Sequence, residues 1–214
     1  MSVLQLRSPI GLSYAAVALL GLCALTDVFE VLLALSVLAQ SGLVANPGRF
    51  DTLYGVFSGI QGLVYISCGI VFCAWLWRVR VNAEIFRPDG HKHSRPWIWA
   101  GWFVPFVNFW YPRRIVVDIW RASTSARPGA SGTGLVNFWW GCWLVAQGVM
   151  LVAPEMAEKG MGTPAFGAVV AYTVGYSLLD LAAALLAAAM VRRMTSMQHE
   201  KAMAGPTISP EPAA

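Results

Sequence analysis

Charged residues are scarce in this sequence. Of its 214 residues, 12% are Asp, Glu, Lys or Arg, whereas an ordinary soluble domain carries about 25%. By contrast, 57% of the residues are hydrophobic, and the mean hydropathy is +0.58. So little polar material cannot coat a surface that faces water on all sides. The shortage of charge therefore excludes an ordinary soluble domain and indicates that much apolar surface faces lipid.

Several chemical signatures are also missing. The four cysteines lie inside apolar runs and form no CxxC pair, so no disulfide framework is predicted. His91 and His93 form an HxH pair in a polar loop, which is only weak evidence for a metal. The sequence contains no GxSxG, Walker, HExxH or dinucleotide-binding glycine pattern. No catalytic residue, metal or cofactor is therefore predicted, and a non-catalytic protein is favoured over an enzyme.

Long apolar runs are what the sequence has instead. A helix needs about 20 apolar residues to cross a hydrocarbon core of about 30 Å. Four runs meet this length, at residues 12–39, 53–77, 135–153 and 164–191, and turn-forming residues separate them. The sequence thus predicts an all-α integral membrane protein, a bundle of four transmembrane helices. Residues 1–201 form its single membrane domain, and the proline-containing tail at 202–214 is expected to be disordered.

The basic residues predict how the bundle is oriented. Of the 15 Lys and Arg residues, nine lie between spans two and three, and only Arg49 and Lys159 lie in the two opposite connections. Basic residues are retained on the cytoplasmic side of a membrane. We therefore expect both termini to be cytoplasmic in a bacterial plasma membrane, with the basic side contacting anionic lipid headgroups. Nucleic acid is not expected as a partner, because the basic residues adjoin the spans and form no separate basic domain.

An aromatic segment between spans two and three is too short to be a fifth span. Residues 97–111 would reach only about 22 Å as a helix. Pro105 removes a helix hydrogen bond, and Asn108 would face lipid. Tryptophan and tyrosine favour the headgroup zone. The segment is therefore predicted to be interfacial or shallowly re-entrant.

The residues that follow this segment extend the prediction. Pro112 suits a helix start. The stretch 113–121 has one apolar face and one face with Arg114, Asp118 and Arg121, which can pair at i,i+4 and i,i+3. This pattern is that of a helix lying in the membrane plane. The interfacial element is thus expected at 97–121. Its candidate motif residues are Trp97, Trp102, Pro105, Asn108, Pro112, Arg113, Arg114, Asp118, Trp120 and Arg121. Upstream, residues 78–85 are expected to extend span two, with Arg80 and Glu84 as a further i,i+4 pair.

A family resemblance rests on this part of the chain. Its elements are Trp75-x-x-Arg78, Val81-Asn82-Ala83, Trp102-Phe103-Val104-Pro105, Asp118-Ile119-Trp120-Arg121-Ala122-Ser123 and Arg192-Arg193-Met194-Thr195-x-x-Gln198. With these elements the sequence resembles the bacterial membrane proteins grouped as domain of unknown function 4328, common in actinomycetes. The resemblance covers roughly residues 12–198. It implies a multi-helix protein of the bacterial plasma membrane, and it implies no activity.

Acidic residues within the spans are the strongest candidates for a polar site. Ionisable groups at bilayer depth are rare and costly. Asp27 and Glu30 lie on one face of span one. Asp27 and Asp180 of span four both lie near mid-bilayer and could face each other in the bundle. Gln61 and Tyr65 of span two and Gln147 of span three could complete a polar interior. The spans contain no Lys or Arg, so three interpretations remain open: neutral acids that join helices, a proton- or cation-linked function, or a water-exposed position.

Three functions are compatible with these patterns. The leading hypothesis is a non-catalytic membrane protein that binds a lipid or an unidentified protein partner in assembly, sensing or signalling. The alternative is a small proton- or cation-coupled transporter that uses the intramembrane acids. A third is a lipid-modifying enzyme with its site under residues 97–112. A polar cavity through the bundle would favour the second, and a cleft at the headgroup level would favour the third.

The predicted orientation can be tested by thiol labelling of intact cells. In a cysteine-free background, single cysteines at Gly48 and Lys159 should react with an impermeant reagent added outside. Cysteines at His91 and Gln198 should react only after the cells are lysed, because the charge distribution places them in the cytoplasm. Labelling at His91 from outside would reverse the orientation.

Overall fold

Every described element of the computed structural model is helical, and the description covers residues 6–39, 47–124, 132–151 and 166–204. Four helices are long and apolar enough to cross a membrane: α1 (Ile10–Ala39), α2 (Pro47–Phe86), α5 (Gly134–Leu151) and α7 (Phe166–Met203). The predicted four-span, all-α architecture is therefore confirmed. α7 runs slightly into the predicted tail, of which residues 205–214 lie outside the described ranges.

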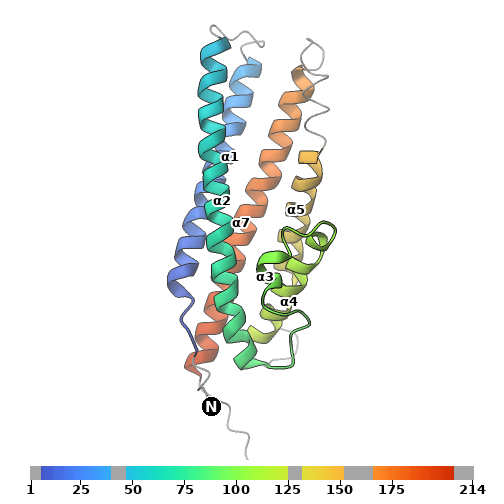
Figure 1. Cartoon of the computed structure of the whole chain (residues 1–214). Helices are drawn as coiled ribbons and strands as arrows, with labels where there is room; N and C mark the ends of the chain where they lie inside the picture. The colour runs from blue at the N-terminus through green and yellow to red at the C-terminus, as the bar shows by residue number, and fades with distance from the viewer. Residues whose placement is uncertain (1–5, 40–46, 125–131, 152–165, 205–214) are drawn as a thin grey trace, which may run out of the picture.

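α7 occupies the centre of the bundle. It packs along α1 on one side and along α5 on the other, while α2 packs mainly along α1 (Figure 1). The outer surfaces of these helices carry large apolar side chains, as lipid contact requires. On the lipid-facing side of α2 these are Leu53, Val56, Ile60, Leu63, Ile66 and Ile70. Several Ser and Thr hydroxyl groups inside the spans donate to backbone carbonyls of their own helix; for example, the Thr26 hydroxyl donates to the Cys23 carbonyl oxygen at 2.7 Å.

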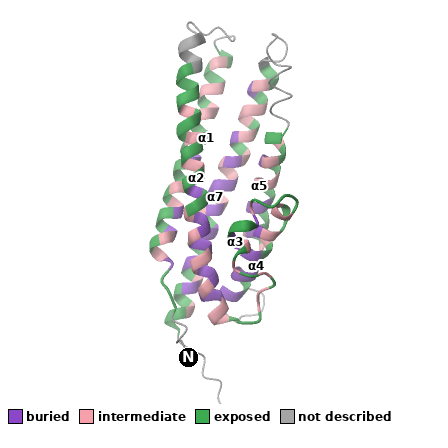
Figure 2. Cartoon of the chain, in the orientation of Figure 1, coloured by how far each residue is buried: buried purple, intermediate pink, exposed green. Residues whose placement is uncertain are grey.

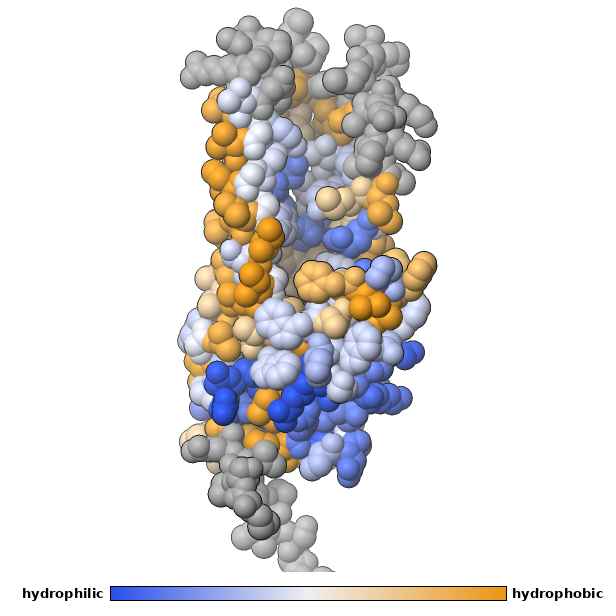
Figure 3. All heavy atoms as spheres, in the orientation of Figure 1, coloured by the Kyte–Doolittle hydropathy of each residue, from blue (hydrophilic) through white to orange (hydrophobic). Residues whose placement is uncertain are grey.

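The two ends of the bundle differ in polarity. At one end of the bundle lie Arg7, Phe86 of α2 and Met203 of α7. We call this the basic end. On the face shown in Figure 3, hydrophilic residues gather at this end, while apolar residues cover α2 above it. α2 continues past residue 77 to Phe86, as the sequence predicts, and α7 continues as one helix past residue 191. Both long helices therefore extend beyond the apolar runs and form the frame of the basic end.

The buried core lies in the basic half of the molecule (Figure 2). Many of its largest fully buried apolar side chains come from α2, α4 (Tyr111–Ser123) and α7; these include Trp75, Leu76, Val79, Ile115, Ile119, Met190 and Met194. The Trp75 indole N–H within this core donates to the Thr195 hydroxyl at 3.1 Å. Fully burying a large apolar side chain contributes about 1.5–3 kcal/mol. α4 therefore joins α2 and α7 where the spans end.

A buried hydrogen-bond network runs through this core. The Gln198 side chain is 1% exposed, and its Nε2 donates to the Val79 carbonyl at 2.8 Å and to the Ser123 hydroxyl at 3.0 Å. Its Oε1 accepts from Asn82 Nδ2 at 3.0 Å. Asn82 in turn pairs with the Arg7 backbone, accepting from its N–H at 2.9 Å and donating to its carbonyl at 2.8 Å. We call this set the Asn82–Gln198 network; it ties α2, α4, α7 and the N-terminal segment together.

The aromatic segment before α4 lies beside the transmembrane part of α2. It contains two short helices, α3 (Trp97–Ala100) and η1 (Val107–Phe109). The Cys73 thiol donates to the Ile98 carbonyl at 3.7 Å, and the Phe72 and Trp102 rings meet edge to face at 6.3 Å. Both α2 residues belong to the predicted second span at 53–77. These contacts support the shallow re-entrant alternative, which remains a prediction.

α4 packs on the other helices more closely than the sequence indicates, and its orientation in the membrane plane stays a prediction. Nine of its 13 residues are buried, and its apolar face is covered by α2, α5 and α7 instead of lipid. Asp118, expected on the charged face, is buried and accepts from the Lys92 backbone N–H at 3.2 Å. Within the described ranges it forms no ion pair with Arg114 or Arg121. α4 has the apolar face that the sequence predicts, but this face packs on protein. The Asp118 carboxylate accepts a hydrogen bond from the loop that contains Lys92.

The Asn82–Gln198 network predicts a specific loss of stability. Replacing Gln198 with Met keeps the volume similar but leaves an Asn82 N–H buried without its acceptor. An orphaned buried donor costs about 1–3 kcal/mol, so the unfolding temperature in detergent should fall by several degrees. Ser196→Ala on the exposed side of the same helix turn is the control and should change stability by less than about 0.5 kcal/mol. Equal unfolding temperatures for Gln198→Met and the wild type would contradict the role of the network.

Candidate functional site

Three helices meet at a polar cluster within the spans. The Tyr65 hydroxyl of α2 lies 2.7 Å from Asp27 Oδ1 of α1 and 2.5 Å from Asp180 Oδ2 of α7. Asp27 is fully buried, and its second oxygen, Oδ2, has no hydrogen-bond partner. Asp180 is 8% exposed. The two aspartates expected to face each other are therefore brought together, with Tyr65 as the bridge between them.

The remaining polar residues of the spans lie apart from this bridge. Glu30 accepts from the Ser177 hydroxyl at 3.1 Å and from the Tyr54 hydroxyl at 3.4 Å. Gln61 and Gln147 are half-buried, and in the described part of the chain their side chains have no hydrogen bond to the cluster. The same residues contain no group of three or more His, Cys, Asp or Glu side chains that could hold a metal ion. The bridging cluster is thus Asp27, Tyr65 and Asp180.

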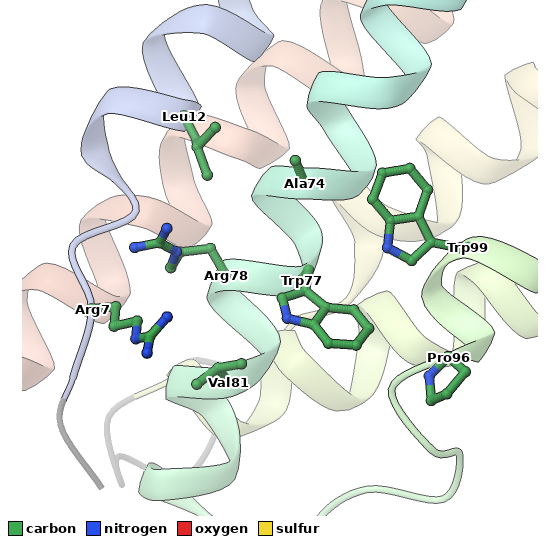
Figure 4. Close-up of a pocket in the computed structure, with 8 residues that line it drawn as sticks. All are labelled: Arg7, Leu12, Ala74, Trp77, Arg78, Val81, Pro96 and Trp99. Atoms are coloured by element: carbon green, nitrogen blue, oxygen red, sulfur yellow. The ribbon is translucent and has the colours of Figure 1, made fainter.

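A second site lies near the basic end, where an open pocket of about 730 Å³ crosses the face of α2 (Figure 4). Arg7 and Arg78 lie on one side of α2, and Pro96 and Trp99 lie on the other. In the described part of the chain neither guanidinium group has a hydrogen-bond or ion-pair partner. The complete lining is Arg7, Leu12, Ala74, Trp77, Arg78, Val81, Pro96 and Trp99. We call this the basic pocket.

Buried polar contacts hold one side of the basic pocket. The backbone of Arg7 is fixed by its two hydrogen bonds to Asn82, which is 3% exposed. Because Asn82 is also bonded to Gln198, the Asn82–Gln198 network determines where Arg7 crosses α2. The pocket therefore depends on the same contacts that close the bundle.

Charged contacts hold the other side of the basic pocket, where Pro96 and Trp99 lie. Arg80 donates to Glu84 at 2.8 Å and to the His93 carbonyl at 2.6 Å. Arg95 donates to the same Glu84, and this hydrogen bond raises the pKa of Arg95 above its ordinary value. The loop that leads to Pro96 and Trp99 is thereby attached to α2. Arg80 and Glu84 form the i,i+4 pair that the sequence predicts.

The predicted interfacial motif residues are mainly packing residues. Trp102 meets the rings of Trp140 and Trp143 at centroid distances of 6.0 and 5.4 Å. Trp97 lies 4.9 Å from the Tyr111 ring. The other positions divide into buried Pro112, Asp118 and Trp120, half-buried Asn108 and Arg113, and exposed Pro105, Arg114 and Arg121. Arg113 donates to Asn137 of α5 at 2.6 Å, so it joins helices within the bundle.

A family model decides where the chain belongs. The model described as Domain of unknown function (DUF4328) matches residues 45–196. The chain belongs to this family. The match includes α2, the aromatic segment, α4, α5 and most of α7, and thus both Tyr65 and Asp180. No curated protein and no solved structure matches the chain. The residues themselves must therefore carry any statement about function.

Sequence reasoning missed the basic pocket. Arg78 was recognised only as part of a family element, and Arg7, Trp77 and Trp99 were not expected at a site. The available signal was an arginine beside the predicted cytoplasmic end of each of two consecutive spans, because consecutive spans run antiparallel and bring those ends together. Ser177 was also missed, since a serine hydroxyl in an apolar helix usually bonds to its own backbone, and Tyr54 was missed as well.

The histidines beside the pocket predict an acid-sensitive loop. Burial lowers the pKa of His91 below its ordinary value of 6.5, and the charge of Arg80 lowers it further. Both ring nitrogens of His91 are buried without a hydrogen-bond partner. The folded protein thus favours neutral His91, and the unfolded chain binds the proton more readily. Stability should be complete above pH 6.5 and fall as the pH drops from 6.5 through the lowered folded pKa.

This pH dependence can be measured by thermal unfolding. His91→Gln should show a smaller loss of unfolding temperature between pH 7.5 and pH 5.5 than the wild type. The exposed His199 provides the matched control, and His199→Gln should retain the full loss. If His91→Gln retained the full loss as well, His91 would not be its source.

Proposed function

We propose that this protein is a non-catalytic membrane protein that binds an anionic phospholipid headgroup in the basic pocket. We further propose that it lies in a bacterial plasma membrane with both termini cytoplasmic. The distribution of Lys and Arg along the sequence supports this orientation. The basic pocket then faces the cytoplasmic leaflet, which carries the anionic lipids.

The unpaired guanidinium groups of Arg7 and Arg78 carry the proposal. Arginine presents planar N–H donors that match phosphate oxygens in bidentate geometry. The two guanidinium groups reach the same side of α2 in Figure 4, and neither is neutralised by a described carboxylate. A phosphodiester at this position would compensate both charges. The apolar lining supplied by Leu12 and Ala74 would lie against the first carbons of the lipid.

The depth of the pocket fits a headgroup. Trp77 and Arg78 stand where the predicted second span ends at residue 77, and tryptophan prefers this boundary between hydrocarbon and water. Phe103 and Phe106 of the neighbouring aromatic segment are 82% and 74% exposed. Exposed phenyl rings suit contact with acyl chains beside the pocket. The aromatic segment would thus anchor the protein next to the bound headgroup.

The lining favours binding over catalysis. Among the lining residues that the structure describes there is no Ser, Thr, Cys, His, Asp, Glu, Lys or Tyr. A lipid-modifying enzyme needs a nucleophile, a general base or a metal at the reacting bond. A cleft at the headgroup level, which would have favoured such an enzyme, here supplies only positive charge and apolar surface. The pocket can hold a phospholipid but offers no group to transform it.

Lipid binding can be measured on the full chain. The protein in a neutral detergent is titrated with phosphatidylglycerol, and bound lipid is counted by native mass spectrometry. An arginine near a membrane surface contributes about 1 kcal/mol to anionic lipid binding. The double variant Arg7→Gln, Arg78→Gln should therefore bind phosphatidylglycerol about 30-fold more weakly. Phosphatidylcholine should bind weakly to both proteins.

A matched control separates the pocket from net charge. Arg121→Gln combined with Arg192→Gln removes two exposed arginines that do not line the pocket. This variant should retain most of the wild-type affinity. An equal loss in both double variants would mean diffuse attraction, and no loss in the pocket variant would refute the proposed site.

A further inference from the structure

The hydroxyl group of Tyr65 makes more contacts than its own hydrogen can supply. It lies within hydrogen-bond distance of one oxygen of Asp27 and one oxygen of Asp180. A phenol has one hydrogen to donate, and an ionised carboxylate can only accept. Both contacts are hydrogen bonds only if one of the two aspartates carries a proton and donates it to the Tyr65 oxygen. We propose that Asp27, Tyr65 and Asp180 form a binding site for a single proton, a property separate from lipid binding.

The surroundings identify Asp27 as the protonated member. Asp27 is fully buried, and its Oδ2 has no partner. An ionised Asp27 would place negative charge on a buried oxygen that has no hydrogen-bond partner. Leaving the oxygen of a neutral carboxylic acid without a partner costs far less. The shorter contact, at 2.5 Å, joins Tyr65 to Asp180. This length is typical of an O–H donor to a carboxylate. The chain of donors therefore runs from Asp27 through Tyr65 to an ionised Asp180.

The neighbouring groups provide no positive charge for a second carboxylate. The ionisable side chains that interact with the cluster are Glu30 and Cys23 on α1, Cys68 on α2 and Tyr176 on α7. None of them is a cation, and the four predicted spans contain no Lys or Arg. Two negative charges at the cluster would be uncompensated. The fully buried Asp27 therefore holds a proton, while Asp180, which is partly exposed and accepts the short hydrogen bond from Tyr65, can bear the single negative charge.

The same geometry gives the proton a path to the surface. Asp27 is completely buried, whereas Asp180 is 8% exposed. When Asp27 passes its proton to the Tyr65 oxygen, Tyr65 passes its own hydrogen to Asp180. This concerted shift leaves Asp27 ionised, Tyr65 neutral and Asp180 protonated, and Asp180 can then release the proton to water. On the face in Figure 3 the molecule is hollowed between α2 and α5, above the aromatic segment. Proton exchange thus requires Tyr65, and it involves contacts among α1, α2 and α7.

Infrared spectroscopy of the full chain in nanodiscs tests the location of the proton. The wild type at neutral pH should show the carbonyl band of a protonated buried carboxyl. Asp27→Asn should remove this band, because Asn replaces a neutral Asp and still donates a hydrogen bond to Tyr65. Asp180→Asn should retain it, and Glu30→Gln, the matched control on the same helix as Asp27, should retain it too. A wild type without such a band, or a band lost only in Asp180→Asn, would overturn the proposal.

A second measurement tests the path and does not depend on the folding of the aspartate variants. On transfer to D2O the carboxyl band of the wild type shifts as the proton exchanges. Tyr65→Phe removes the bridge without adding charge, so the exchange should slow about tenfold or more. The control is Tyr54→Phe, which changes an α2 tyrosine outside the bridge. In this variant the carboxyl proton should exchange at the wild-type rate. Equal exchange rates in Tyr65→Phe and the wild type would show that Tyr65 carries no proton.

Discussion

The hydrogen-bond network of Gln198 with Asn82 is the constraint on which the rest of the molecule depends. In a membrane the apolar faces of helices gain little by leaving lipid, so specific polar contacts and close packing must select one arrangement. Here one buried amide joins α7 to the backbone of α2 and to α4, and its partner amide fixes the N-terminal segment. The fully buried aromatic and aliphatic core surrounds these bonds. Asn82 and Ser123, which lie within the region matched by the family model, thereby become partners of Gln198 in one network.

The predictable part of the structure follows from run length and charge. The apolar runs correctly predicted four long helices, and the i,i+4 spacing of Arg80 and Glu84 correctly predicted an ion pair. Pairing between distant helices was harder to predict, because helical periodicity identifies a face but not the surface that covers it. α4 shows this: its apolar stripe was read as facing lipid, yet it packs on protein. The aspartates were expected to meet, but a sequence does not show that one tyrosine lies between them. Arg7 and Arg78 are 71 positions apart, so only the fold makes them neighbours.

Both candidate sites use the same long helices. α2 contributes Tyr65 to the proton site and Trp77 and Arg78 to the basic pocket, and α1 follows the N-terminal segment that contains Arg7. The two sites are thus attached to one rigid element at different depths. A movement of α2 against α1 that follows the state of Asp27 and Asp180 would also change the spacing of the two arginines. The proposed lipid binding and the proposed proton binding therefore share one helix, through which each could influence the other.

The central position of α7 has a consequence for biogenesis. α1 and α5 both pack mainly on α7, yet α7 leaves the ribosome after the other three described spans. Until it is inserted, α5 lacks its principal neighbour, and the carboxyl group of Asp27 lacks the helix that carries Asp180. Gln198, which closes the core, follows later still. α1 and α2 can pack on each other before α7 arrives, but the polar cluster and the core at the basic end form only when α7 is in place. A chain that stops before α7 would leave the carboxyl group of Asp27 in lipid without its full set of neighbours, which is costly.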